Sequence, residues 1–192
     1  VSDTYLLLQA QANLNRMDPF SSFDSISMPQ ELIGVDLSNI KMAYSADLGC
    51  AAVDNEIKSI FLDKVSTFKS NFRKSEQAEP HFLDVHNCFE VIRGFNYVAS
   101  HKERFDNSKD LLGPNVIDNF DRWLKYSLSD LSLAHVMQTK IYRNFRNFFN
   151  EYDVLICPAA SVSPYPHEKL FVDEINGEKM PTYMRWLSIS YA

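Results

Sequence analysis

Two segments of this chain hold the side chains best suited to chemistry, and each segment predicts a strand followed by a loop. The first reads IKMAYSADLGCAAVDNE and carries Asp47 and Asp54, whereas the second reads YDVLICPAASVSPYPH and carries Cys157 and His167. A cysteine with a histidine is the minimum for a thiolate nucleophile and its base, and two carboxylates are the minimum for a general acid–base pair. Each pattern has to be weighed against an ordinary structural role.

The cysteine pattern favours a structural role. Cys157 ends a short apolar run, and His167 follows it ten residues later, across Pro158, Pro164 and Pro166. A reactive thiolate needs a base or a positive field close by, and the neighbouring sequence supplies neither. We therefore interpret Cys157 as a packed strand cysteine and keep an unrelated cysteine hydrolase as the last alternative.

The carboxylates and histidines also fit structural roles. Asp47 and Asp54 flank the turn between the first strand and a helix, which predicts a turn residue and a helix N-cap. His81, Asp84 and His86 lie close together, but the histidines are five residues apart across an expected helix start. Zinc sites on a helix need a spacing that places both ligands on one face. We therefore expect no metal site.

Glycine spacing excludes the common phosphate-binding and nucleophile-elbow motifs. No two of the five glycines lie within ten positions of each other. A Walker loop or a dinucleotide fingerprint needs clustered glycines so that backbone amides can approach the ligand, and a G-x-S-x-G elbow needs them two residues either side of serine. The sequence therefore predicts no cofactor.

Charge argues against a nucleic-acid or membrane partner. The net charge is −6, no apolar run is long enough to span a bilayer, and the first residues lack the features of a signal peptide. The segment KIYRNFRNFF mixes cations with aromatics, but at helical spacing Ile141 and Phe145 share one side while Lys140 and Arg143 lie on another. This pattern predicts an amphipathic helix.

The cysteines are odd in number and widely spaced, which predicts free thiols in the cytoplasm.

The elements that must position these residues alternate between strands and helices. Ile40–Ser45 and Val154–Cys157 predict strands, and Lys69–Pro80 predicts a turn region. The helices are expected to begin at Asp54, at Asp84 and reach about Ser100, at Pro114 and reach about Tyr126, and at Ser129 and reach about Asn150. The predicted fold class is α/β, with a mixed sheet, flanking helices and a helix-rich middle.

The two ends of the chain predict a piece of a larger body. Asp3–Leu14 predicts a helix, and Asn15–Ser38 predicts a long surface connection. Tyr183–Tyr191 predicts the start of a helix that has no terminator, and the chain does not begin with methionine. We interpret residues 1–192 as one incomplete domain.

Several motifs taken together resemble the amidase-signature family. Val53-Asp54-Asn55-Glu56 resembles the Val-Asp-Pro-Glu helix start of that family, although Asn55 replaces the usual proline. The Tyr-Asp-Val-Leu run before Cys157 resembles a late strand of the family, with Ala159 where threonine is common. The Ile175-Asn176-Gly177 turn and the helix near Asp3 also match in order. The resemblance is weakest across residues 69–125 and implies the C-terminal portion of the amidase-signature fold.

The family hydrolyses or transfers amide groups with a Ser-Ser-Lys triad and without a metal or organic cofactor. In that family the triad precedes the region that this chain resembles. The adjacent pair Ser21 and Ser22 lacks the glycines of the family loop, so no catalytic residue is assigned here. The resemblance implies a scaffold and pocket wall for a small-molecule amide, with Pro158, Tyr183 and Trp186 as substrate-binding candidates. A non-catalytic small-molecule or protein-binding module is the alternative, and a homo-oligomer is left open.

Overall fold

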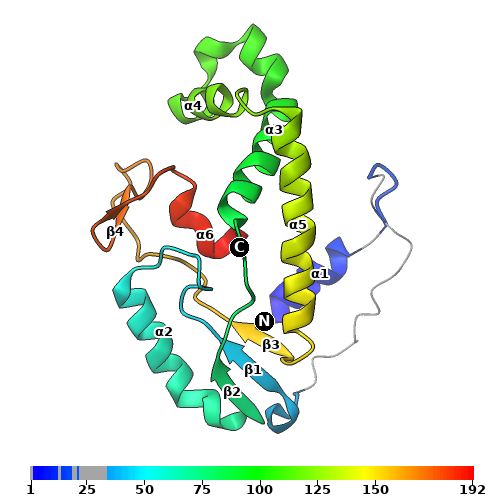
Figure 1. Cartoon of the computed structure of the whole chain (residues 1–192), viewed down its shortest axis with the longest axis vertical. Helices are drawn as coiled ribbons and strands as arrows, with labels where there is room; N and C mark the ends of the chain where they lie inside the picture. The colour runs from blue at the N-terminus through cyan, green and yellow to red at the C-terminus, as the bar shows by residue number, and fades with distance from the viewer. Residues whose placement is uncertain (1, 13, 19–20, 22–33) are drawn as a thin grey trace. The chain divides into compact units, whose positions relative to one another are not determined.

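The computed structural model describes residues 2–12, 14–18, 21 and 34–192, which fall in two compact units, Val1–Asp36 and Leu37–Ala192. In the first unit, helix α1 (Ser2–Gln11) ends before the predicted Leu14 (Figure 1). Most of the predicted Asn15–Ser38 connection, with Ser22, lies outside the described residues.

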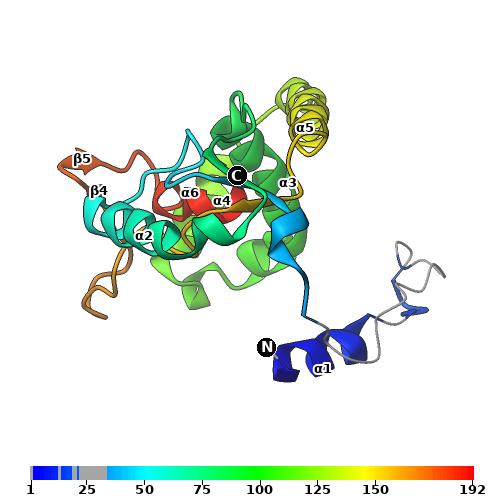
Figure 2. The same ribbon diagram turned by 90° about the horizontal axis from the view of Figure 1, so that it is seen from below.

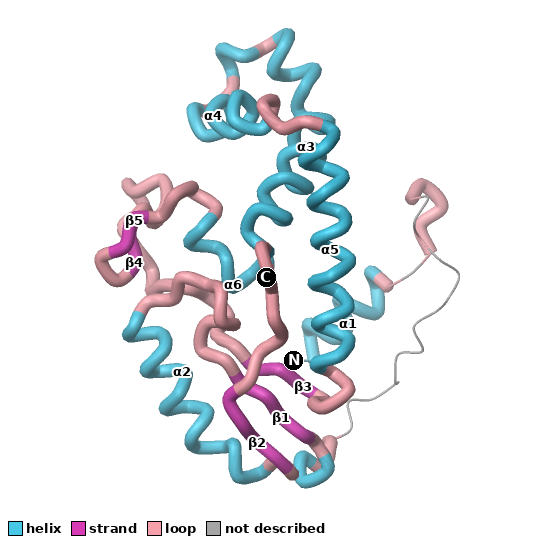
Figure 3. The backbone as a smooth tube through the Cα atoms, in the orientation of Figure 1, coloured by secondary structure: helices cyan, strands magenta, loops and turns pink. Residues whose placement is uncertain are grey.

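A parallel sheet forms the base of the second unit. Its strands are β1 (Lys41–Tyr44), β2 (Lys74–Gln77) and β3 (Val154–Ile156), in the order β2-β1-β3 with both pairings parallel. Figure 3 shows the three strands lying side by side. The middle strand buries Met42 and Ala43 completely, as a central strand covered on both faces requires.

Helix α2 (Asn55–Phe68) connects β1 to β2 and completes a βαβ unit. Asp54 caps it as predicted, because its Oδ1 accepts the Glu56 N–H at 2.8 Å. Of the apolar stripe on this helix, Val65 is fully buried, whereas Ile60 remains half exposed. The predicted strand–loop–helix order is therefore confirmed.

Strand β2 was missed by the sequence prediction, which placed a turn region there. The strand reads Lys-Ser-Glu-Gln and has no apolar alternation. It lies at the edge of the sheet, where charged side chains are common because they discourage pairing with other chains. Pairing with β1, rather than local pattern, makes this segment a strand.

Three helices separate β2 from β3: α3 (Val85–Asn107), α4 (Pro114–Trp123) and α5 (Leu128–Phe148). α3 packs along α5 and also against α4 (Figures 1 and 2). α3 extends beyond the predicted end at Ser100, and α4 begins at Pro114 as predicted. α5 is capped by Ser127 instead of Ser129, because Ser127 forms a reciprocal capping box with Asp130.

The C-terminal part consists of a short hairpin and two short helices. β4 (Glu174–Ile175) and β5 (Glu178–Lys179) form an antiparallel pair. Asn176 and Gly177 join them with φ of 54° and 83°, as a tight hairpin turn requires. η4 (Arg185–Leu187) and α6 (Ser188–Tyr191) follow, so the helix predicted from Tyr183 begins as a 3₁₀ turn. Three further 3₁₀ turns are η1 (Leu37–Asn39), η2 (Lys69–Asn71) and η3 (Lys109–Leu111).

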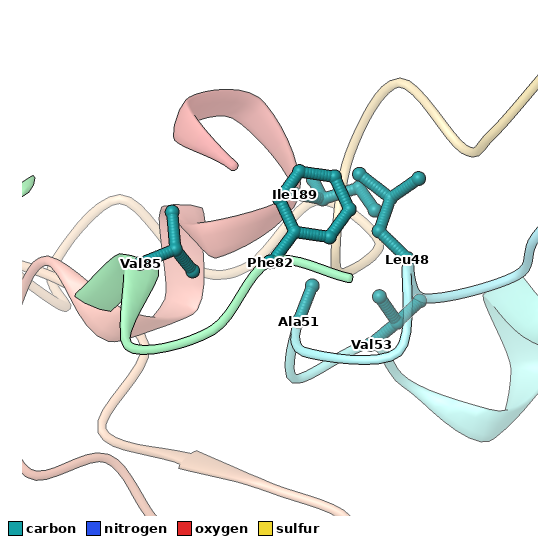
Figure 4. Packing of buried hydrophobic residues seen from close by; sticks show 6 residues of the cluster. All are labelled: Leu48, Ala51, Val53, Phe82, Val85 and Ile189. Carbon is teal, nitrogen blue, oxygen red and sulfur yellow. The ribbon is translucent and has the colours of Figure 1, made fainter. Parts of the chain in front are cut away.

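The α/β fold class with flanking helices and a helix-rich middle is confirmed. In the described ranges, the larger sheet is parallel throughout and the antiparallel pair is separate. No described helix combines the length and apolar character that a bilayer crossing requires. A core cluster joins the loop after β1, the segment before α3 and α6 (Figure 4), and its members are Leu48, Ala51, Val53, Phe82, Val85 and Ile189.

Candidate functional site at the carboxyl edge of the sheet

Three loops leave the carboxyl ends of the parallel strands at the same edge of the sheet. We call residues 45–54, 78–83 and 157–161 the carboxyl edge. Open α/β sheets bind ligands at this edge. A cavity of about 280 Å³ lies between the first two loops, and Gly49, Cys50 and Glu79 contribute to its lining.

The loop after β1 has a strained backbone at its centre. Leu48 and Gly49 adopt left-handed φ values of 56° and 66°, a conformation that is unfavourable for an aliphatic residue such as leucine. Two contacts hold Leu48 in place, since its side chain is buried in the core cluster and its N–H donates to Ser45 Oγ at 2.9 Å. At Gly49, a Cβ would lie 3.2 Å from a carboxylate oxygen of Glu79. The left-handed φ of Gly49 therefore favours glycine, whereas the Glu79 side chain could move away from an added Cβ.

Asp47 closes the same loop, as the sequence predicted for a turn residue. Its Oδ1 accepts the Gly49 N–H at 3.0 Å, and its other oxygen pairs with Lys58 on α2. Burial acts to raise the pKa of Asp47, but the Lys58 ammonium and the Gly49 N–H outweigh it and hold that pKa below the usual value. A carboxylate that stays ionised and paired in this way is a structural anchor, not a general acid.

The start of α2 is joined to two distant segments. The Asp54 N–H donates to the Ser161 carbonyl at 2.8 Å, which links the loops after β1 and β3. Asn176 in the hairpin turn accepts the Asn55 N–H at 3.0 Å and donates from Nδ2 to the Val53 carbonyl at 2.9 Å. These bonds fix the position of the helix N-terminus relative to the carboxyl edge.

His86 connects the carboxyl edge to the end of the chain. Its Nε2 lies 2.9 Å from the Cys50 carbonyl, and its Nδ1 lies 2.9 Å from the Tyr191 hydroxyl. Because a carbonyl can only accept, Nε2 of the neutral ring carries the hydrogen, and Nδ1 accepts from Tyr191. Tyr191 also stacks on Phe89, with ring centroids 3.8 Å apart. The imidazole therefore acts as a neutral bridge between α3, the first loop and α6.

This bridge predicts a loss of stability in mild acid. Burial lowers the pKa of His86, and the Arg185 charge acts in the same direction. The folded state therefore binds this proton less readily than the unfolded state, so the stability is present above the unfolded pKa of about 6.5 and is lost as the pH falls through it and then through the folded pKa. We expect the free energy of unfolding in urea to fall from about pH 7.5 to about pH 5.5, and to fall less in His86→Gln. Equal slopes for the two proteins would contradict this role.

Comparison with known proteins relates this geometry to one enzyme family. No family model matches the chain. The acylamidase of Rhodococcus erythropolis is 22% identical over 171 residues, which cover 86% of this chain and 35% of that enzyme. The crystal structure of a bacterial aryl acylamidase of the amidase-signature family is similar in fold, with a TM-score of 0.67 at 15% identity over 79% of this chain and 34% of that one. A second crystal structure, of an amidase, gives a TM-score of 0.71 at 12% identity over 84% of this chain and 36% of that one.

The chain is related to the amidase-signature enzymes over part of their length. It spans about a third of the length of the relatives that it matches. The resemblance to that family is therefore confirmed over a partial region. Because the match covers only part of these enzymes, it does not assign their serine chemistry to this chain.

The three substrate-binding candidates lie in different surroundings. Pro158 is buried on the loop after β3. Tyr183 packs against Phe171 at a centroid distance of 6.1 Å, and Trp186 meets Tyr165 edge-on at 5.6 Å. Trp186 Nε1 is buried and has no hydrogen-bond partner among the described residues. Their role in binding substrate stays a prediction.

Two of the cysteines are poorly suited to nucleophilic chemistry. Burial and the nearby Asp47 carboxylate raise the pKa of Cys50 to about 11, and burial raises the pKa of Cys157. The imidazole of His167 is almost fully exposed and pairs with Glu168. The geometry therefore does not support the cysteine-hydrolase alternative.

Alkylation should reveal the unreactive state of these thiols. With iodoacetamide at neutral pH, we expect Cys50 and Cys157 to be labelled more slowly in the folded chain than in the chain unfolded by urea, because only the thiolate reacts. Mass spectrometry of the digested chain measures each site separately. Labelling of Cys157 faster in the folded chain than in the unfolded one would restore the cysteine hypothesis.

The residues considered for a metal site and for nucleic-acid binding have structural roles instead. In the described part of the chain, no three His, Cys, Asp or Glu side chains are placed to hold a metal ion. On α5, the side chains of Lys140 and Arg143 are exposed while Ile141 and Phe145 are partly buried, as an amphipathic helix requires.

Sequence reasoning missed the hydrogen bonds made by His86, and no local signal could have revealed bonds that span 36 and 105 residues.

Ser188 is a second residue that the sequence analysis did not identify. It is completely buried, and its hydroxyl accepts the Ala52 N–H at 3.2 Å across 136 residues of sequence. The first residue of α6 therefore holds the end of the loop after β1. A small polar side chain at the start of a short helix does not by itself indicate such a role.

Proposed function

We propose that this chain is a portion of an amidase that hydrolyses the carbon–nitrogen bond of small acyl amides through a serine nucleophile. The chain would supply scaffold and pocket wall, and polypeptide outside residues 1–192 would supply the reactive serines. The observation that carries the proposal is that this region is similar to an acylamidase in sequence and to amidase-signature enzymes in fold.

In this reaction, an acyl amide and water give a carboxylic acid and an amine. The nucleophilic serine attacks the amide carbonyl, and backbone N–H groups stabilise the resulting oxyanion. Stabilisation of this kind is usually the largest single contribution to the rate enhancement. By the family resemblance, those groups precede the region that this chain resembles. The contribution of this chain is to hold the carboxyl edge rigid through the bonds of Asp54, His86, Asn176 and Ser188.

Unsatisfied polar atoms near the carboxyl edge support a role in a larger site. Ser161 Oγ, Arg185 Nε and Trp186 Nε1 are buried and have no hydrogen-bond partner among the described residues. Buried polar groups are nearly always bonded in complete proteins. A pocket wall that awaits a substrate, ordered water or neighbouring polypeptide would account for all three.

Apolar side chains left exposed on α5 support the same proposal. Leu133 and Val136 are 66% and 53% exposed. The pattern of this helix predicts that these two residues face a core, and their spacing of three places them on one side of the helix. Exposed apolar residues that lie together can mark a contact with another body. A larger amidase would cover this surface.

An activity assay and the surrounding gene test the proposal. We expect the complete reading frame that encodes residues 1–192 to include a lysine and a glycine- and serine-rich loop with two serines, and its product to release 4-nitroaniline from 4-nitroacetanilide. We expect residues 1–192 alone to release none. In the complete product, Trp186→Ala should raise KM if this ring lines the pocket, and Trp186→Phe should have the smaller effect because it keeps most of the apolar surface.

Two results would overturn the proposal. One is amide hydrolysis by residues 1–192 alone that is abolished when serines of this chain are replaced. The other is a reading frame that starts immediately before Val1 and stops after Ala192, which would favour the binding-module alternative. A fluorophosphonate probe that labels a serine of the complete product outside residues 1–192 would support the proposed division of roles.

A further inference from the structure

A second cavity, larger than that at the carboxyl edge, lies between α3 and α5. Its volume is about 500 Å³, which is within the range of small-molecule sites. Phe89, Ile92 and Tyr97 of α3 line it together with Ile141 of α5 and Tyr191 near the chain end. It shares no lining residue with the cavity at the carboxyl edge. The walls are mainly apolar and aromatic.

Among the described residues, one permanently charged side chain lines this cavity. It is that of Arg93, and no described aspartate or glutamate side chain lies in the lining. The guanidinium lies 6.0 Å from the Phe89 ring centroid and 5.9 Å from that of Trp123. Its Nε is buried without a hydrogen-bond partner in the described ranges, and none of the ion pairs found there includes Arg93. A guanidinium held by two rings and left without an anion has unused binding capacity.

The acidic residue nearest to Arg93 on its own helix is engaged elsewhere. Glu90 precedes it by three residues, but its Oε1 accepts the Thr182 hydroxyl at 2.9 Å. Glu90 therefore joins α3 to the C-terminal part, and none of the ion pairs found among the described residues joins Glu90 to Arg93.

We propose that the cavity between α3 and α5 binds an amphipathic monocarboxylate, with its carboxylate on Arg93 and its apolar tail among the aromatic walls. A planar guanidinium matches a carboxylate with two parallel hydrogen bonds. One cation balances one negative charge, so a monocarboxylate fits better than a phosphate dianion. The Arg93 charge disfavours a protonated amine, because like charges repel each other. This inference stands on Arg93 and its cavity and does not require the proposed amidase activity.

Three matched ligands test the site on residues 1–192 by isothermal titration calorimetry. The probes are 4-phenylbutyrate, 4-phenylbutan-1-ol and 4-phenylbutylamine, which share a tail and differ in the charge of the head. We expect the acid to bind about tenfold more tightly than the alcohol, as a charge-assisted hydrogen bond predicts, and the amine to bind more weakly than the alcohol. Arg93→Met should weaken acid binding about tenfold and leave alcohol binding unchanged.

Arg104→Met is the matched control, because Arg104 lies exposed on the same helix and should leave all three affinities unchanged. Retained alcohol binding by Arg93→Met shows that the cavity still forms. The proposal is overturned if wild-type chain binds the acid no more tightly than the alcohol, a comparison that needs no variant. It is also overturned if Arg93→Met weakens acid and alcohol equally.

Discussion

Phe120→Ala is expected to destabilise the chain by about 3–5 kcal/mol, the cost of removing a large aromatic side chain from a packed interior. Phe120 is completely buried on α4, and its ring stacks on Phe105 of α3 with centroids 3.9 Å apart. The substitution leaves a cavity between the two helices, which can close only if they move toward each other. Urea unfolding followed by circular dichroism measures the change.

A nearby exposed residue provides the control. Leu111→Ala removes an apolar side chain that is 80% exposed in η3, and it should change the free energy of unfolding by less than about 0.5 kcal/mol. Phe120→Leu should fall between the two, because it retains much of the buried volume. If Phe120→Ala costs no more than Leu111→Ala, then α4 does not pack on α3 as described.

The same interface shows what sequence reasoning can and cannot reach. Pro114 marks the start of α4 through a local rule, because the first turn of a helix tolerates proline. Gly94 in the middle of α3 has no local explanation, since glycine weakens a helix by about 1 kcal/mol relative to alanine. The structure explains it: a Cβ at Gly94 would lie 2.7 Å from Trp123 Cγ. The requirement comes from α4, which no local pattern reveals.

Elements with strong local signals could be predicted, and those that depend on distant partners could not. The Asp54 cap and the Asn176–Gly177 turn follow from side-chain chemistry over a few residues. β2 carries no strand pattern and depends on pairing with β1. The sequence analysis placed the cap of α5 at Ser129, two residues after the observed cap at Ser127. Serine can cap a helix at either position, and the capping box with Asp130 selects Ser127.

The location of the candidate site was easier to predict than its contacts. If two neighbouring strands are parallel, the loops that follow them lie at the same edge of the sheet. β1 and β3 are adjacent and parallel, so this condition is met. The contacts that hold this edge join segments more than 100 residues apart, as Ser188 to Ala52 and Asn176 to Val53 show. Serine and asparagine occur in many loops, so the sequence alone does not distinguish these two.

Asn176→Ala is expected to destabilise the chain by about 2–3 kcal/mol, because it removes two hydrogen bonds and places alanine in a left-handed conformation. Asn176 adopts φ of 54°, accepts the Asn55 N–H and donates to the Val53 carbonyl. Asn176→Gly separates the two contributions, since glycine loses both bonds but accepts the backbone conformation. We expect it to cost about 1 kcal/mol less than alanine.

The same pair of variants decides whether this hairpin supports the carboxyl edge. If the turn holds the start of α2 in place, both variants should increase amide hydrogen exchange at Asn55 and Glu56, because these N–H groups belong to the first turn of α2. Exchange on α4, which is not bonded to the hairpin, serves as the internal reference. Increased exchange confined to residues 174–179 would mean that the hairpin opens by itself and leaves the helix start intact. In that case, the position of α2 would depend on the Asp54 to Ser161 bond, and the hairpin would have no part in shaping the candidate site.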